Sequence, residues 1–270
     1  MFTLSRWTWP RWIPTLMPYF VMLNYFMDLL YSLVHFSHLG KQRAVVMNVT
    51  NVFGYIYTVF DMFLILVSLI LTLGTRIEES GVILLLIGRV IHRLLLSIWS
   101  MLLYYLFSEC QDMGCLLMLL ATKAKMHAEK GCPKMEVSSY HLLLLGARLC
   151  LCCMFLIWMD EDLNVIFNIL SLLLFISIGL GFYCKVCSYL TLLVLMYHDI
   201  FSNHWSMLFG WNDYFLSMNY FAMFFGKIGA FLMLSELGAG KWSMDSYLGL
   251  NDYERDQKGG YKIIKEQATA

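Results

Sequence analysis

Ionisable side chains lie within long apolar runs of this sequence, and they are the residues whose types could support chemistry. They are Asp28, Asp61, Arg89, His92, Arg93, Glu109, Asp112, Arg148, His198, Asp199, Lys227 and Glu236. A charge in an apolar membrane helix costs roughly 2.5–3.5 kcal/mol on insertion scales, so such residues usually face the interior of a bundle. They can line a polar cavity or ion path there, or they can form ion pairs between helices.

Interhelical pairing is the interpretation that the pattern favours. The apolar runs contain neither a dense relay of carboxylates and histidines nor a pair of half-helices broken by glycine and proline, which mark many transporter sites. We therefore expect Asp28 and Asp61 to neutralise Arg93 or Arg148 across the bundle. These four residues are the predicted structural charges of the membrane interior.

Two pairs of possible metal ligands are too small to predict a metal site. Cys184 and Cys187 have CxxC spacing without a second ligand pair, so a turn between two helices is the better interpretation. His35 and His38 stand three residues apart without a third ligand, which is typical of polar groups at a membrane interface. We expect neither a metal nor another cofactor.

Motifs of the common enzyme classes are also missing from the sequence. There is no HExxH, GxSxG or Walker loop, and no GxGxxG followed by an acidic residue at the required spacing. The acidic run Asp160–Asp162 is typical of a solvated turn. We predict a protein that is not an enzyme.

The composition identifies the medium in which these residues must be positioned. Of 270 residues, 60% are apolar and 14% are charged, whereas soluble domains contain about 45–50% apolar and about 25% charged residues. The basic and acidic residues cancel, at 19 each, which excludes a nucleic-acid-binding protein with a basic surface. The sequence predicts a polytopic helical membrane protein whose first partner is the lipid bilayer.

Eight apolar runs are long enough, or nearly so, to cross a membrane, which takes about 20 residues. They are Pro14–Phe36, Val52–Gly74, Val82–Trp99, Leu102–Ala121, Tyr140–Met159, Leu163–Phe182, Cys187–Phe201 and Met218–Leu237. The run Leu102–Ala121 is the weakest, because Glu109, Gln111 and Asp112 interrupt it. We predict an all-α transmembrane bundle of seven or eight spans over residues 14–237.

Short sequence motifs recur along the chain. They favour a duplicated four-helix unit over chance repetition in a leucine-rich sequence. Leu73-Gly74 before one apolar run is paralleled by Leu180-Gly181 before a later one. Gly114–Leu119 is paralleled by Gly229–Leu234. The second parallel supports counting the fourth run as a span.

The basic residues predict the orientation, because lysine and arginine concentrate in short cytoplasmic loops. With eight spans, one side collects most of them and the other holds only Lys41 and Arg43. We expect a cytosolic N-terminus at 1–13 and a cytosolic tail at 238–270. If the fourth run does not cross, the tail remains cytosolic and the N-terminus does not.

Several short segments of the sequence resemble the surfeit locus protein 4 family of endoplasmic-reticulum cargo receptors. Gly146–Phe155 is similar to the Gly-Gly-Arg and apolar fifth span of that family, and Gly114–Ala121 to its glycine-then-leucine stretch. Met27-Asp28 and Gln42-Arg43 are similar to its first span and loop. The ending Leu234–Asp245 resembles its closing Ser-Met-Asp motif.

This resemblance implies a non-enzymatic receptor that sorts secretory proteins between endoplasmic reticulum and Golgi, with lumenal cargo and a vesicle coat as partners. The tail departs from the family, which closes soon after Ser-Met-Asp with a dilysine signal. Here 25 residues follow Asp245, and no lysine stands three or four places from the end. Tyr261 and Ile264 fit the tyrosine-x-x-hydrophobe pattern that adaptor proteins bind, and are the predicted replacement signal.

A different class of function remains open from the sequence alone. Short loops, abundant aromatic residues and a basic, acid-free first twenty residues also suit a structural accessory subunit of a larger membrane complex. Such a subunit would lie, for example, in the mitochondrial inner membrane with other membrane proteins as partners. A small-molecule transporter or membrane oxidoreductase is the third alternative.

Overall fold

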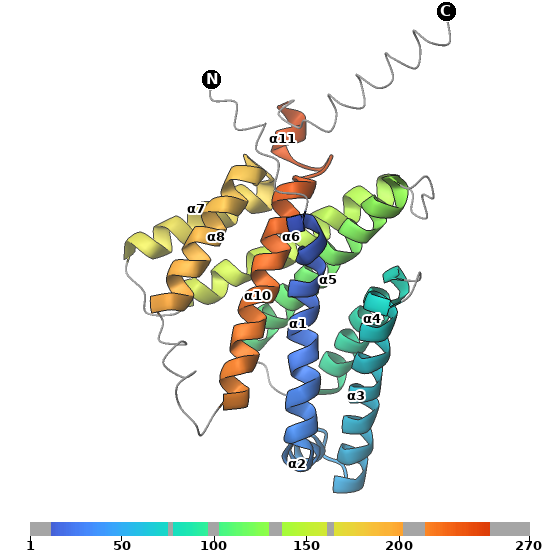
Figure 1. The fold of residues 1–270 in the computed structure, drawn as a ribbon. Coiled ribbons are helices and arrows are strands. Elements are labelled where there is room, and N and C mark those ends of the chain that lie inside the picture. The colour runs from blue at the N-terminus through green and yellow to red at the C-terminus, as the bar shows by residue number, and fades with distance from the viewer. Residues whose placement is uncertain are drawn as a thin grey trace, which may run out of the picture.

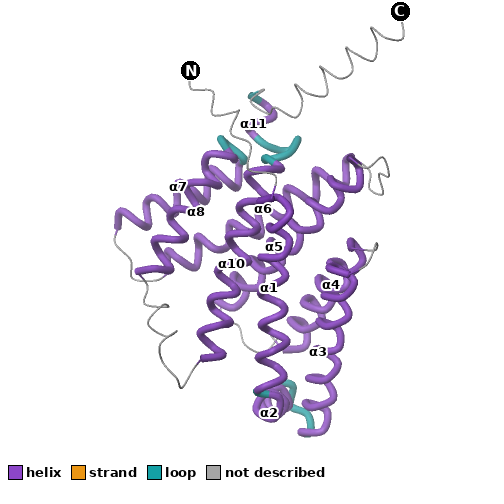
Figure 2. Tube along the Cα trace, in the orientation of Figure 1, coloured by secondary structure: helices purple, strands orange, loops and turns teal. Residues whose placement is uncertain are grey.

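A computed structural model of the chain describes residues 12–74, 78–96, 103–129, 137–160, 165–201 and 214–248. Within these ranges every regular element is a helix, as Figures 1 and 2 show. The helices are α1 (Trp12–Val34), α2 (Phe36–Val46), α3 (Asn51–Gly74), α4 (Glu78–Leu96), α5 (Leu103–Glu129), α6 (Val137–Asp160), α7 (Val165–Leu180), α8 (Cys184–Phe201), α10 (Tyr214–Leu237) and α11 (Met244–Tyr247).

Each of the eight predicted apolar runs coincides with one long helix, which confirms the all-α membrane bundle. By length and apolar composition, three segments of the described chain are long enough to cross a membrane: Leu16–Val34, Asn51–Gly74 and Ser139–Ile157. Val165–Leu180 and Cys184–Tyr197 are shorter apolar helices. Eight crossings therefore stay a prediction.

The long helices run alternately between the two ends of the bundle. In Figure 1 the start of α1, the α7–α8 turn and the end of α10 lie at the upper end, and α2 lies at the opposite end. This alternation is what an eight-span topology requires. Under the predicted orientation the upper end is cytosolic and α2 is lumenal.

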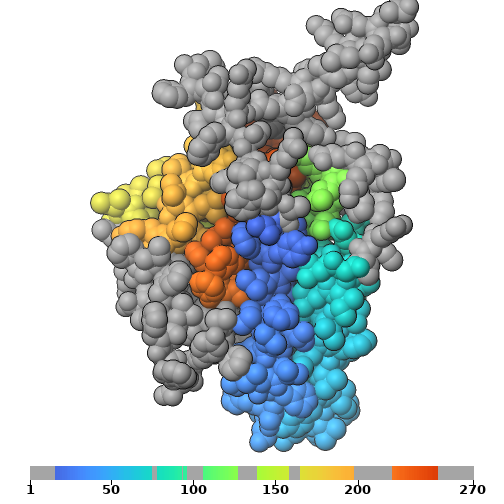
Figure 3. Space-filling view, in the orientation of Figure 1, coloured from blue at the N-terminus to red at the C-terminus, as the bar shows by residue number. Residues whose placement is uncertain are grey.

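Helices α1, α5, α6 and α10 form the centre of the bundle. The α1 helix packs against α10, α3 and α5, and α5 packs against α6, α10 and α4. On the face in Figure 3, α1 lies between α10 on one side and α3 and α4 on the other. Large side chains such as Tyr25, Leu116, Phe155 and Phe231 are almost completely buried between these helices. This core fixes the relative positions of the polar groups described below.

Small hydroxyl side chains are buried on α3 without breaking its hydrogen bonding. Thr58, Ser68 and Thr72 donate to the carbonyl oxygens four residues earlier, at 2.7–2.8 Å. Because lipid offers no hydrogen-bond partners, this local bonding is how a hydroxyl is accommodated in an apolar helix. The opposite side of α3 is apolar and exposed, with Phe53 and Phe63 among its side chains.

The contacts of two glycines support the predicted duplication. A Cβ on Gly114 of α5 would lie 2.8 Å from the Leu151 backbone nitrogen of α6, and a Cβ on Gly229 of α10 would lie 3.0 Å from the Met17 carbonyl of α1. Each matching glycine thus lets the last helix of one half approach the backbone of the first helix of the other. This exchange of partners is expected of two related halves packed face to face.

Helix α2 differs from the loop that the sequence predicts here, since this segment is too polar to predict a span. It packs against α3, and its closest approach occurs where Gly40 lies beside Gly54 and the Tyr55 ring. The absence of side chains on the two glycines allows the backbones to meet. Because of this contact, the Arg43 side chain of α2 is buried in the bundle.

Candidate functional site

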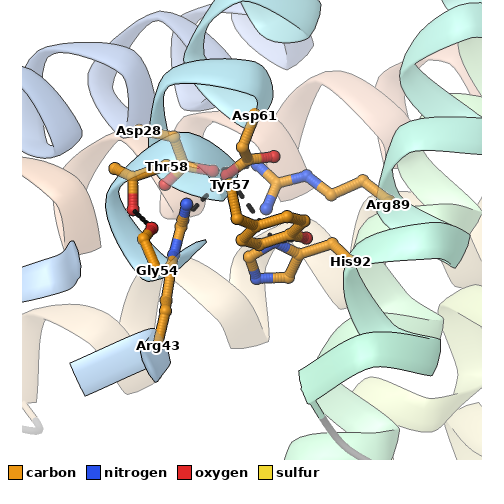
Figure 4. Close-up of polar contacts among 8 residues, drawn as sticks. All are labelled: Asp28, Arg43, Gly54, Tyr57, Thr58, Asp61, Arg89 and His92. Atoms are coloured by element: carbon orange, nitrogen blue, oxygen red, sulfur yellow. Dashed lines mark hydrogen bonds and ion pairs between the residues drawn. The ribbon is translucent and has the colours of Figure 1, made fainter. Parts of the chain in front are cut away.

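Six polar side chains from four helices converge in the first half of the bundle, and Figure 4 shows them pointing toward one another. We call this group the charge cluster: Asp28 of α1, Arg43 of α2, Tyr57 and Asp61 of α3, and Arg89 and His92 of α4.

Each acid of the charge cluster pairs with an arginine from a different helix. Arg43 Nη2 donates to Asp61 Oδ2 at 2.7 Å, and Arg89 forms an ion pair with Asp28. The side chains are largely buried, with 10–23% of their surface exposed across the two pairs. Because an isolated charge is costly in a medium of low dielectric, these pairs allow four ionised groups to stay inside the bundle.

Aromatic rings and His92 complete the electrostatic environment. The Tyr57 hydroxyl lies 3.0 Å from His92 Nδ1, which in turn lies 3.6 Å from Asp61 Oδ2. The Arg43 guanidinium carbon lies 5.2 Å from the centre of the Tyr57 ring, within the range of a cation–π interaction. Asp61 therefore faces both Arg43 and the imidazole, and protonation of His92 would add a second positive charge beside it.

Some hydrogen-bonding capacity of the charge cluster remains unused. Arg43 Nη1 and Arg89 Nε are buried and find no hydrogen-bond partner among the described residues. Buried donors of this kind are normally satisfied. These two nitrogens could donate to an oxygen atom of a ligand that reached the cluster.

The charge cluster connects to the centre of the bundle through Tyr25. Its ring lies 4.8 Å from the Arg89 guanidinium carbon, and its hydroxyl donates to the Asp112 carbonyl at 3.5 Å. Asp112 and the neighbouring Gln111 are themselves buried on α5. Two of the polar residues that weaken the prediction of the fourth span, Gln111 and Asp112, thus face the interior of the protein.

The predicted pairing of Arg148 with Asp28 or Asp61 is wrong, because those acids pair with Arg89 and Arg43. Arg148 is completely buried on α6, and its Nη2 donates to the Trp242 carbonyl at 2.7 Å. Its partner is therefore a backbone group of the segment that follows α10. The side chain of Arg93, the other predicted partner, lies outside the described residues.

A second polar region, which we call the C-terminal dock, is formed where residues 238–248 fold back onto the α7–α8 turn. Asp245 accepts hydrogen bonds from the backbone N–H groups of Tyr183 at 2.7 Å and Cys184 at 2.8 Å, and its own N–H donates to the Gly181 carbonyl at 3.0 Å. The first N–H groups of a helix have no partner within the helix. Asp245 supplies that partner for α8 from a distant part of the chain.

The α7–α8 turn has the backbone conformation of a Schellman motif. The Phe182 N–H donates to the Ser177 carbonyl and the Gly181 N–H to the Ile178 carbonyl. Gly181 has a φ of 70°, and a Cβ there would collide with the Arg148 guanidinium. Glycine is required at this position by both the conformation and the close approach.

The Ser-Met-Asp motif can now be explained by its contacts. Ser243 caps α11, because its hydroxyl oxygen accepts from the Ser246 N–H at 3.2 Å, while Asp245 caps α8. Met244 is exposed. In the sequence this motif is visible only as a resemblance to a family. Its role could not be predicted, because it depends on hydrogen bonds to residues about 60 positions earlier.

The remaining predicted residues have varied outcomes. Cys184 and Cys187 are free thiols in the first turn of α8, directly after the turn between helices in which the sequence placed them. His35 lies at the break between α1 and α2, where its ring packs at a tilt against the Tyr31 ring, with ring centres 4.6 Å apart. Tyr261 and Ile264 lie outside the described residues.

The family model described as the SURF4 family matches residues 7–248 of the chain. The match ends with the last described residue of the C-terminal dock and does not include 249–270. The comparison with the curated proteins and the comparison with the solved structures gave no match.

Proposed function

The chain belongs to the SURF4 family, and we propose that it is a non-enzymatic membrane receptor that sorts secretory proteins between endoplasmic reticulum and Golgi. The family is the one that the sequence resembled, the surfeit locus protein 4 family. The apolar helices support an integral membrane protein. In this proposal the cargo binds from the lumen, and a vesicle coat or adaptor binds the cytosolic tail.

The observation that carries the proposal is the charge cluster. The cluster brings two ion pairs and a histidine together inside the bundle at a cost of desolvation, and among the described residues it leaves one buried nitrogen each of Arg43 and Arg89 free to donate. The cluster shares its end of the bundle with α2, which the distribution of basic residues predicts to be lumenal. A receptor can use these groups to bind oxygen atoms of its cargo.

The test is a rescue experiment in cells from which the protein has been removed. We expect the wild-type chain to restore secretion of its clients from the endoplasmic reticulum. The double variant Arg43→Met with Asp61→Leu should fold, since no charge is left unpaired, and should fail to restore secretion. Thr72→Ala, which removes a buried hydroxyl bonded only to its own helix, is the matched control. Full rescue by the double variant would contradict a receptor site in the charge cluster.

Localisation separates this proposal from the structural alternative. A fluorescently tagged receptor should cycle between endoplasmic reticulum and Golgi. A mitochondrial location, with stable co-purification of a membrane complex, would replace the receptor by an accessory subunit.

A further inference from the structure

Exposed aromatic side chains gather at the C-terminal dock, where a water-facing surface would be polar. The exposed fractions are 39% for Phe182, 50% for Tyr183, 61% for Trp242 and 87% for Tyr247. We call these four residues the aromatic end. Phe182 and Tyr183 lie against each other, with ring centres 4.7 Å apart. Large exposed apolar groups on a well-packed segment indicate a surface that contacts something other than water.

The backbone that carries the aromatic end is held in place from inside the bundle. The Trp242 carbonyl accepts from the buried Arg148, and the Tyr183 N–H donates to Asp245. Tyr183 has a φ of 44°, which is unusual for a residue with a side chain. The exposure of these rings is therefore a property of a fixed turn, since the hydrogen bonds that hold the backbone do not involve the rings.

An exposed apolar surface runs along α7 toward Phe182 of the aromatic end. Leu173, Ile176 and Leu180 expose 57%, 46% and 57% of their surface on this helix, which is one of the apolar helices of the bundle. Phe182 follows directly beyond its end. A surface of this kind on a membrane helix contacts acyl chains, and its end meets the headgroup region, where tryptophan and tyrosine are enriched.

We propose that the aromatic end is an anchor that inserts into the boundary between headgroups and acyl chains of the phospholipid bilayer. The exposed side chain of Lys241 lies next to Trp242 in the chain, and its ammonium group can reach lipid phosphates while the ring occupies the boundary below them. The C-terminal dock thereby fixes the depth at which this end of the bundle meets the membrane.

The test uses the full chain reconstituted into phosphatidylcholine vesicles whose acyl chains carry bromine on the carbons nearest the headgroup. Bromine quenches tryptophan fluorescence by contact, so the emission of Trp242→Phe is subtracted from that of the wild type to isolate Trp242. We expect the difference emission to be largely lost in brominated vesicles and unaffected by iodide in the water. An emission that iodide quenches and bromine does not would overturn the proposal, and would leave the aromatic end to a protein partner.

Two controls keep this result interpretable. First, Trp242→Phe preserves the backbone carbonyl that accepts from Arg148. Second, if maleimide still fails to label the buried Cys184 thiol, the C-terminal dock is intact. If the thiol is labelled, Phe182→Trp in a chain carrying Trp242→Tyr moves the fluorophore to the neighbouring segment. Quenching by bromine at that position supports the anchor, and quenching by iodide alone overturns it.

Discussion

The charge cluster and the C-terminal dock both hold ionised side chains inside the bundle, but they balance those charges with different groups. In the charge cluster, Asp61 and Arg43 are side chains from neighbouring helices that satisfy each other. In the C-terminal dock, Asp245 accepts from backbone N–H groups, and Arg148 donates through Nη2 to a backbone carbonyl while its buried Nε and Nη1 have no hydrogen-bond partner among the described residues. A side-chain partner can be changed by mutation, whereas a backbone partner remains. The two regions should therefore differ in whether a second substitution can repair the first.

The largest effect is expected for breaking one ion pair in the charge cluster. Asp61→Leu leaves the Arg43 guanidinium buried without its acid and should destabilise the protein by about 3 kcal/mol. Adding Arg43→Met removes the unpaired charge, so most of that loss should be regained. Unfolding of the purified protein in detergent, followed by helical circular dichroism, measures both. A double variant as unstable as the sum of the single ones would show that the pair is not a unit.

The next effect concerns Asp245, where no second substitution can help. Asp245→Ala leaves two N–H groups at the start of α8 without acceptors and should cost about 2 kcal/mol. Asp245→Asn keeps one side-chain oxygen and should cost less. The opening of this helix end should expose the buried Cys184 to maleimide, while Cys115, buried on α5, stays protected. Equal labelling of both thiols would mean that the whole bundle, and not the dock, has loosened.

A smaller loss of stability is expected at Gly181, and none at Gly74, its counterpart in the predicted duplication. Gly181→Ala forces a side chain into a left-handed conformation at about 1–2 kcal/mol, and the new methyl group would displace Arg148. Gly74→Ala is the matched control, because a Cβ there meets nothing within 4 Å, and it should be neutral or slightly stabilising. Similar losses for the two substitutions would refute the role of Gly181 in the dock. Thermal unfolding of the two variants is sufficient to decide.

The smallest effect on stability is expected for truncation after Leu248. Residues 249–270 lie beyond the C-terminal dock and beyond the match to the family, so the midpoint of thermal unfolding should not change. If Tyr261 and Ile264 form the sorting signal of a receptor, the truncated protein should nevertheless move to a different compartment. Tyr261→Ala alone should reproduce that shift. An unchanged location after truncation would remove the tail from the proposed function.

The long helices could be predicted from the sequence because a helix that crosses a membrane needs about twenty mostly apolar residues in a row. Such runs are visible in the sequence itself. Each of the eight runs agrees with a long helix of the described chain for this reason. Helix α2 could not be predicted in the same way, because its stability comes from packing on α3 through Gly40 and Gly54 and not from its own hydropathy.

What the sequence determined by itself is the all-helical membrane architecture, the family, and the fact that charges such as Asp28, Asp61 and Arg148 lie inside the bundle. Only the tertiary structure decided which groups form ion pairs or hydrogen bonds with them. Any of several basic residues could pair with Asp61 as far as composition is concerned, and the choice of Arg43 depends on where α2 packs. For Arg148 and Asp245 the partners are backbone groups, which every residue possesses, so no pattern of side chains can reveal them.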